Sequence, residues 1–268
     1  MTLADPNPGP HFFTKKLELY CGKVPFIITD VLEQMKKSNA SQSEGIFRLS
    51  AQKTTVENLC GMLDKGPLES FSDFEEPHLL ACVIKRYIRE LSLLDPLISV
   101  DIADDINTEI QVHMGDESIY QNLQNLIDKN PNKTKRNTLA VLMKYFKEIT
   151  DDKDVNRMEA SNLAIVFSPS LYPRSDSVAS GNAMKAVELM ITDQDKIFKP
   201  EWSDSNLVFL TPEDIVKMSE PMIYEEDAVL ESQRRNNREH STIPVDRHNL
   251  IKILNLQRPE RVAPLLKA

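Results

Sequence analysis

The chain has 268 residues, of which 41% are hydrophobic and 27% are charged. This length and composition suit one large domain, or one domain with an extension. The formal net charge of −9 argues against nucleic acid as a general partner. Only 7 residues are glycine, which disfavours phosphate-binding glycine loops and tight hairpins and favours a helical protein.

The three cysteines, Cys21, Cys60 and Cys82, are scattered, so they predict neither a disulfide framework nor a metal clip. Reduced thiols packed as small hydrophobic side chains are typical of a cytoplasmic protein, which is the location we expect. The N-terminal segment lacks the regions of a signal peptide, and no run reaches the roughly 18 apolar residues of a membrane span. We therefore expect no transmembrane segment.

Helical spacing of apolar residues begins at Pro25, which suits a first turn, and continues to residue 37. Ser50 and Thr54 are candidate caps for the next helix, which Gly66-Pro67 ends.

The pattern from Pro77 is the strongest in the chain, because it places a broad apolar stripe on one helix face. The stripe consists of Leu79, Leu80, Val83, Ile84, Tyr87, Ile88 and Leu91. Lys85 and Arg89 are four residues apart and therefore lie one turn apart at its edge. Further helices are predicted at about 101–114, 117–129, 134–150, 155–168 and 182–198. No convincing strand run precedes residue 200, so the sequence predicts an all-α domain.

The character of the chain changes after residue 200, where short apolar patches alternate with prolines. Thr211-Pro212, followed by two acidic residues, predicts a helix start, and residues 249–256 are a second candidate helix. We interpret residues 201–268 as a C-terminal extension of unknown role and expect the domain to fold without it.

Motifs for chemistry within the chain itself are lacking. Gly61 and Gly66 have the glycine spacing of a phosphate-binding loop, but Pro67-Leu68 stand where Lys and Ser or Thr are required. The histidines show no metal-ligand spacing, and no GxSxG nucleophile motif occurs. We therefore expect no metal, no cofactor and no nucleotide site, and we do not expect the chain to be an enzyme on its own.

Three segments point to one family by their order and separation. They are EGIFRLSAQ at 44–52, HLLACVIKRYIREL at 78–91 and NLAIVFSPSLYPR at 162–174. With the preceding VPFIITDVLEQM at 24–35, they closely resemble the RhoGAP domain of Rho GTPase-activating proteins. The resemblance covers residues 15–200 and implies an all-α, RhoGAP-like helical bundle.

The resemblance also implies a function. It implies binding to a Rho-family small GTPase in its GTP-bound form, and insertion of an "arginine finger" into the partner's GTP site. Arg48 matches this catalytic arginine. Lys85 and Arg89 match a pair in which the lysine contacts the GTPase and the arginine supports the finger loop from behind. Ser170 matches a further GTPase contact, and Asn162 matches an asparagine that we expect to be mainly structural.

Arg48 lies in an apolar run, although its side chain always carries charge. Taken alone, this pattern favours a partly buried ion pair whose stem packs on its neighbours. The resemblance favours a finger instead, because a guanidinium delivered from an apolar loop stabilises the charge that develops in phosphoryl transfer. We expect Gly45 to allow close approach of the backbone, Phe47 to anchor the loop, and Asn162 and Pro169 to support the site.

The chain departs from the family pattern in three places, one of which is Ala51, where the family often has glycine. Ser168-Pro169-Ser170 stands where the family usually has Gly-Pro-Asn or Gly-Pro-Thr, and the segment after Leu91 is two residues longer. Two hypotheses therefore stay open. One is a GTPase activator that acts in trans, and the other is a module of the same fold that holds a GTPase or another protein without accelerating hydrolysis. Recruitment to a membrane by the partner is also left open.

Overall fold

The structure is a computed structural model that describes residues 11–172 and 177–219. Within these ranges the chain is helical and forms no β-strand, which confirms the all-α fold. The longer helices are α1 (Phe26–Lys37), α2 (Lys53–Leu63), α3 (Pro77–Leu94), α4 (Val100–His113), α5 (Ser118–Asp128), α6 (Lys133–Asp151), α8 (Ala160–Leu171), α9 (Ser177–Thr192) and α12 (Pro212–Ser219). The short turns are η1 (Leu17–Tyr20), η2 (Ala40–Gln42), α7 (Lys153–Asn156), α10 (Gln194–Ile197), η3 (Pro200–Trp202) and α11 (Ser205–Val208).

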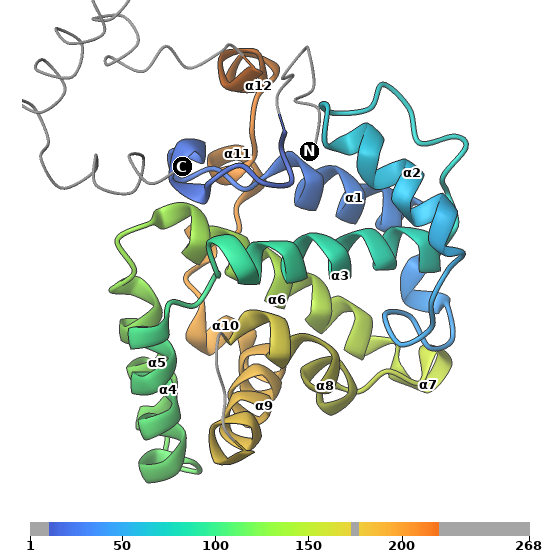
Figure 1. Ribbon diagram of the computed structural model, residues 1–268. Helices are drawn as coiled ribbons and strands as arrows, with labels where there is room; N and C mark the ends of the chain where they lie inside the picture. The colour runs from blue at the N-terminus through green and yellow to red at the C-terminus, as the bar shows by residue number, and fades with distance from the viewer. Residues whose placement is uncertain (1–10, 173–176, 220–268) are drawn as a thin grey trace, which may run out of the picture. The chain divides into compact units, whose positions relative to one another are not determined.

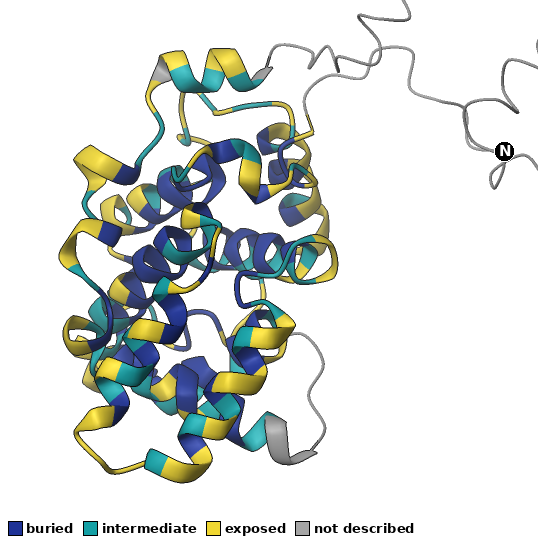
Figure 2. Ribbon diagram, turned by 90° about the vertical axis from the view of Figure 1, so that its left-hand side faces the viewer, coloured by how far each residue is buried: buried dark blue, intermediate teal, exposed yellow. Residues whose placement is uncertain are grey.

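Helix α3 crosses the middle of the bundle and contacts α1, α2 and α8 (Figure 1). Every member of its predicted apolar stripe is buried, with at most 3% of the residue surface exposed. The other helices follow the same rule, with buried faces toward the centre and exposed faces outward (Figure 2). Helices α4 and α5 pack on each other, and α4 also contacts α9 (Figure 1). The apolar spacing in the sequence therefore accounts for the core.

Several predicted helix boundaries are wrong. The helix expected at 155–168 is two helices, α7 and α8, because Arg157 adopts a left-handed backbone conformation (φ 61°) and ends the first one. Pro169 lies inside the last turns of α8, which runs three residues beyond the expected end at 168. The N-cap of α2 is Gln52, rather than Ser50 or Thr54. The spacing of apolar residues in the sequence does not mark these helix ends and caps.

Packing continues beyond residue 200, where we expected the domain to end. Trp202 and Val208 are 2% and 3% exposed. The backbone N–H of Val24 donates to the carbonyl oxygen of Val208 at 2.7 Å, so this segment pairs with the chain two residues before the start of α1. Buried and hydrogen-bonded residues of the described chain therefore continue past residue 200. At the other end of the described chain, Phe12 is also fully buried.

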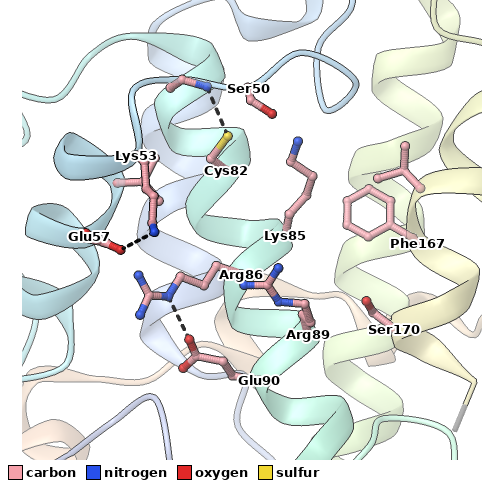
Figure 3. Close-up of a pocket in the computed structure, with 13 residues that line it drawn as sticks. Ser50, Lys53, Glu57, Cys82, Lys85, Arg86, Arg89, Glu90, Phe167 and Ser170 are labelled. Atoms are coloured by element: carbon pink, nitrogen blue, oxygen red, sulfur yellow. Dashed lines mark hydrogen bonds and ion pairs between the residues drawn. The ribbon is translucent and has the colours of Figure 1, made fainter.

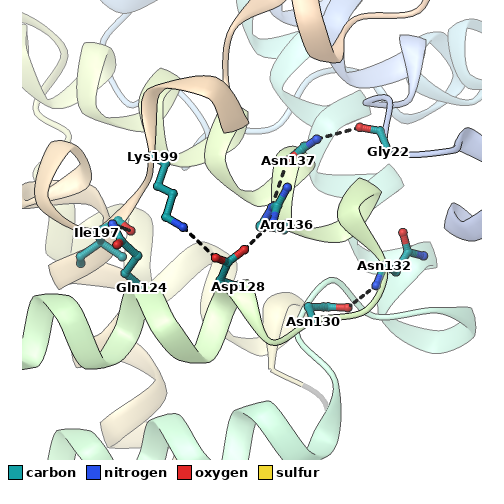
Figure 4. Close-up of polar contacts among 9 residues, drawn as sticks. All are labelled: Gly22, Gln124, Asp128, Asn130, Asn132, Arg136, Asn137, Ile197 and Lys199. Atoms are coloured by element: carbon teal, nitrogen blue, oxygen red, sulfur yellow. Dashed lines mark hydrogen bonds and ion pairs between the residues drawn. The ribbon is translucent and has the colours of Figure 1, made fainter.

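Charged groups fasten this late segment to α5 and α6. Asp128 accepts hydrogen bonds from Lys199 and Arg136 (Figure 4). These bonds hold the pKa of the Asp128 carboxyl below its ordinary value, and the bond from Lys199 contributes most. The Arg136 guanidinium and the Lys199 ammonium lie 4.6 and 5.2 Å from the centre of the Trp202 ring. Cation–π contacts thus add to the burial of this tryptophan.

The predicted helix start at Thr211 is confirmed. The backbone N–H of Asp214 donates to the Thr211 hydroxyl at 3.2 Å, and the N–H of Thr211 donates to the Asp214 carboxylate at 3.0 Å. This reciprocal pair is a capping box. The candidate helix at 249–256 lies outside the described residues.

We predict that Trp202→Ala lowers the free energy of unfolding by about 3–5 kcal/mol, because a large buried side chain leaves a cavity when it is truncated. Urea denaturation of the purified chain measures this change. The control is Leu207→Ala, since Leu207 lies in the same segment but is 56% exposed. It should change stability by less than about 0.5 kcal/mol. Equal, small effects of both changes would show that this segment is not part of the folded core.

Candidate functional site

The segment that contains Arg48 is a compact turn between η2 and α2. The backbone is left-handed at two of its residues, Gly45 (φ 68°) and Phe47 (φ 66°). A Cβ atom at position 45 would lie only 3.0 Å from Cγ of Leu49 and 3.3 Å from a terminal nitrogen of Arg48. The turn therefore needs glycine at 45 both for its conformation and for space. The carbonyl oxygen of Gly45 accepts hydrogen bonds from the N–H groups of Arg48 and Leu49, both at 2.9 Å.

Phe47 fixes this turn to the core. Its ring is fully buried and makes edge-to-face contacts with Phe146 and Phe167, with ring centres 5.4 and 5.3 Å apart. A third edge contact, to Tyr145, spans 6.4 Å. Phe146 of α6 and Phe167 of α8 also stack on each other, with ring centres 4.3 Å apart. We call these two rings, which receive the ring of Phe47, the aromatic socket. A left-handed backbone at a bulky residue is uncommon and costs free energy, which this packing offsets.

Arg48 follows directly and lies on the surface. The residue is exposed, and within the described part of the chain its guanidinium forms no ion pair or hydrogen bond. The ion pair that the sequence pattern around Arg48 favoured is thus not formed among the described residues. The buried neighbour fixes the position of the backbone, and the charged side chain remains available to another molecule.

Lys85 reaches the same turn from α3. Its ammonium donates to the carbonyl oxygens of Phe47 at 2.7 Å and of Leu49 at 3.2 Å, on the two sides of Arg48. Burial lowers the pKa of Lys85 below its ordinary value. Arg89, one turn further along α3, is exposed, and its guanidinium makes no hydrogen bond to any residue that the structure describes. In this structure the loop support that we expected from Arg89 comes from Lys85.

A pocket of about 580 Å³ lies beside the turn, between α2, α3 and α8. Figure 3 shows Lys85, Arg89 and Ser170 around it, with Lys85 extending toward the segment of Ser50. Four cations and two carboxylates line the pocket: Lys53, Lys85, Arg86, Arg89, Glu57 and Glu90. The carboxylates pair with Lys53 at 3.7 Å and with Arg86 at 2.7 Å. The two cations left over make this pocket locally positive on a chain whose net charge is −9.

The residues from the third segment lie on α8. Ser170 lines the pocket, whereas Asn162 is half-buried and donates from its amide to the carbonyl oxygen of Arg157 at 3.3 Å. Pro169 is exposed beside Ser170. The structure thus places Lys85, Arg89 and Ser170 around one pocket and Arg48 in the turn beside it, while Asn162 contacts the turn before α8.

Two residues of this region escaped the sequence analysis. Cys82 lines the pocket, and its thiol accepts from the N–H of Ala51 at 3.4 Å, at the end of the segment that contains Arg48. Asn156 bonds the turn directly, since its carbonyl oxygen accepts from the N–H of Gly45 at 2.7 Å. Neither contact follows from periodicity, because 31 and 111 residues separate the partners.

Groups for other kinds of chemistry are not assembled in the described ranges. Residues 11–172 and 177–219 contain no cluster of three or more His, Cys, Asp or Glu side chains that could hold a metal ion. No helix in that part of the chain is long and apolar enough to cross a membrane. The site is a helical surface with an arginine that has no partner within these ranges, in a turn next to a positive pocket.

Comparison with known proteins identifies the family. Residues 25–176 match the RhoGAP domain, which is more than half of the chain. The chain therefore belongs to the RhoGAP family. It is 31% identical over 136 residues to Rho GTPase-activating protein 44 of Rattus norvegicus, and 30% identical over 177 residues to SH3 domain-binding protein 1 of Homo sapiens. These alignments cover 50% and 61% of this chain but only 16% and 24% of the relatives.

Solved structures show the same fold. Human Rho GTPase activating protein 15 superimposes with a TM-score of 0.64 at 22% identity, over 71% of this chain and 93% of that one. The BH domain from GRAF, the GTPase regulator associated with focal adhesion kinase, gives a TM-score of 0.57 at 20% identity, over 69% and 97%.

We predict that Lys85→Met lowers the free energy of unfolding by about 1–3 kcal/mol, because it removes two charge-assisted hydrogen bonds and leaves two carbonyl groups without this donor. Arg89→Met is the matched control on the same helix face and should change the free energy of unfolding by less than about 0.5 kcal/mol. Urea denaturation of both variants measures the difference. If Arg89→Met lost more stability than Lys85→Met, Arg89 rather than Lys85 would be the residue that supports the Arg48 turn.

Proposed function

We propose that this chain stimulates GTP hydrolysis by a GTP-bound, Rho-family small GTPase, with Arg48 as an arginine finger supplied in trans. The observation that carries the proposal is the contrast between Phe47, fully buried, and Arg48, exposed and unpaired within the described residues. The buried ring holds the backbone of the turn in place, and the exposed guanidinium is available to another molecule. Membership of the RhoGAP family supports the same role.

The chemistry of phosphoryl transfer explains why an arginine is needed. Negative charge shifts onto the bridging and terminal phosphoryl oxygens as the bond breaks, and a planar guanidinium can donate to two oxygens at once. Phe47 holds the loop before the partner arrives, so little ordering is required during the reaction. The domain supplies this cation, and the nucleotide is bound by the partner. The chain therefore acts on a reaction in another protein, without a nucleotide site of its own.

The rest of the surface suits a protein partner that is acidic at the contact. We propose that Lys85, Arg89 and Ser170 bind the GTPase around the finger, with Gly45, Phe47, Asn162 and Pro169 as structural support. The excess of positive charge in the pocket would attract carboxylates and speed encounter. A role in cytoplasmic signal transduction and cytoskeleton regulation fits such a partner.

We predict that Arg48→Ala loses most of the stimulation, by a factor of about 10³–10⁵, because a finger supplied in trans acts mainly in the transition state. Its affinity for the GTP-bound partner should stay within about tenfold of wild type, or about 1.4 kcal/mol. Arg48→Lys should restore little, since an ammonium lacks the planar fork. Single-turnover hydrolysis by a panel of Rho-family GTPases, with saturating chain, measures the rates.

The matched control is Lys129→Ala, which removes an exposed cation at the end of α5, outside the pocket. It should stimulate hydrolysis as wild type does. If Arg48→Ala also stimulates fully on a GTPase that it binds, Arg48 is not a finger. If the wild-type chain binds a GTPase without stimulating it, the alternative of a binding module takes the place of this proposal.

A further inference from the structure

Asn156, the last residue of α7, is fully buried beside the Arg48 loop. Its backbone carbonyl oxygen accepts from the N–H of Gly45, the left-handed residue three positions before Arg48. This bond, at 2.7 Å, joins the loop to the turn between α7 and α8. The placement of Asn156 therefore bears directly on the placement of the loop.

The side chain of Asn156 fixes that placement. Its amide nitrogen donates to the carbonyl oxygens of Ser41 at 2.8 Å and of Ile149 at 2.7 Å. Its amide oxygen accepts from the N–H of Met158 at 2.7 Å. Both amide hydrogens are thus used, and a buried amide satisfied in this way strongly favours one arrangement of the groups around it.

These bonds hold three backbone segments that meet at the site. Ser41 lies in η2, just before the finger loop, Ile149 lies near the end of α6, and Met158 leads into α8. Helix α6 carries Phe146 of the aromatic socket, and α8 carries Phe167 of the socket and Ser170 of the pocket. One side chain therefore sets the loop relative to both of its neighbours.

We infer that Asn156 is a positioning residue for the reaction of the GTPase partner, acting through the loop that carries Arg48. This inference rests on the proposed function. A displacement of about 1 Å in a catalytic group can cost about 10²-fold in rate. Loss of the amide should therefore lower the maximal rate of stimulated hydrolysis more than it weakens binding.

The test compares Asn156→Ala with Asn137→Ala. Asn137 is a matched control because it is also a buried asparagine, 6% exposed, whose amide donates to a backbone carbonyl, that of Gly22, at 2.7 Å (Figure 4). It contacts neither the finger loop nor the pocket in the described structure. Circular dichroism first establishes that both variants are folded at the assay temperature.

The readout is single-turnover hydrolysis of GTP-loaded Rho-family GTPases as a function of chain concentration. Asn156→Ala should lower the maximal rate by at least about tenfold and change the half-saturating concentration by less than about threefold. Asn137→Ala should leave both within about twofold. Equal effects of the two variants, or an effect of Asn156→Ala on half-saturation alone, would overturn the positioning role.

Two further measurements keep the outcomes separate. Arg48→Ala is assayed alongside. If Arg48→Ala stimulates hydrolysis as well as wild type, the proposed function fails. If Arg48→Ala is impaired but Asn156→Ala stimulates as well as wild type, the positioning role fails. Hydrogen exchange of the wild-type chain decides the matter should Asn156→Ala not fold. The Gly45 amide should exchange at least about 10²-fold more slowly than an unprotected peptide group, and exchange at the unprotected rate would overturn the inference.

Discussion

Burial of the Phe47 ring is the interaction on which the candidate site depends. The residue holds a left-handed backbone conformation, which costs about 1–3 kcal/mol. Full burial of a phenylalanine contributes about 1.5–3 kcal/mol, and each edge-to-face aromatic contact adds about 0.5–1.5 kcal/mol. The contacts with Phe146 and Phe167 therefore outweigh the strain. Without them, the chain would have little reason to turn sharply just before Arg48.

The same turn explains why neighbouring residues differ so much in exposure. Ile46 and Phe47 point inward and are fully buried, while Arg48 and Leu49 lie on the surface. The ammonium of Lys85 donates from α3 to the carbonyl groups on the two sides of Arg48. The loop is thus held by apolar packing on one side and by a cation on the other, and the arginine needs no internal partner to keep its position.

Much of the fold could be predicted because it depends on regular spacing. The stripe of α3 repeats at helical intervals over thirteen residues, from Leu79 to Leu91, and every member is buried as expected. Trp202 gave no such signal, because it docks through a single buried ring and two cations rather than through a periodic face. The left-handed turn at Arg157 was missed because a residue other than glycine rarely adopts that conformation.

The site shows a similar division. The sequence motifs selected Arg48, Lys85, Arg89 and Ser170, of which the last three line one pocket and Arg48 lies in the turn beside it. Periodicity could not assign Lys85 to the loop carbonyls, because that contact joins residues 36 and 38 positions apart through backbone atoms. Asn156 escaped for the same reason, since its bonds go to the main chain of distant segments, where residue type carries little information.

The most direct test of a pre-positioned finger is the preference of the chain for the GDP–aluminium fluoride form of a Rho-family GTPase over the GDP form. Aluminium fluoride mimics the transferring phosphoryl group, so a residue that acts in the transition state should favour this form. Isothermal titration calorimetry should show wild type binding it at least about tenfold more tightly, and Arg48→Ala should reduce that preference to less than about threefold. An undiminished preference in Arg48→Ala would contradict the finger.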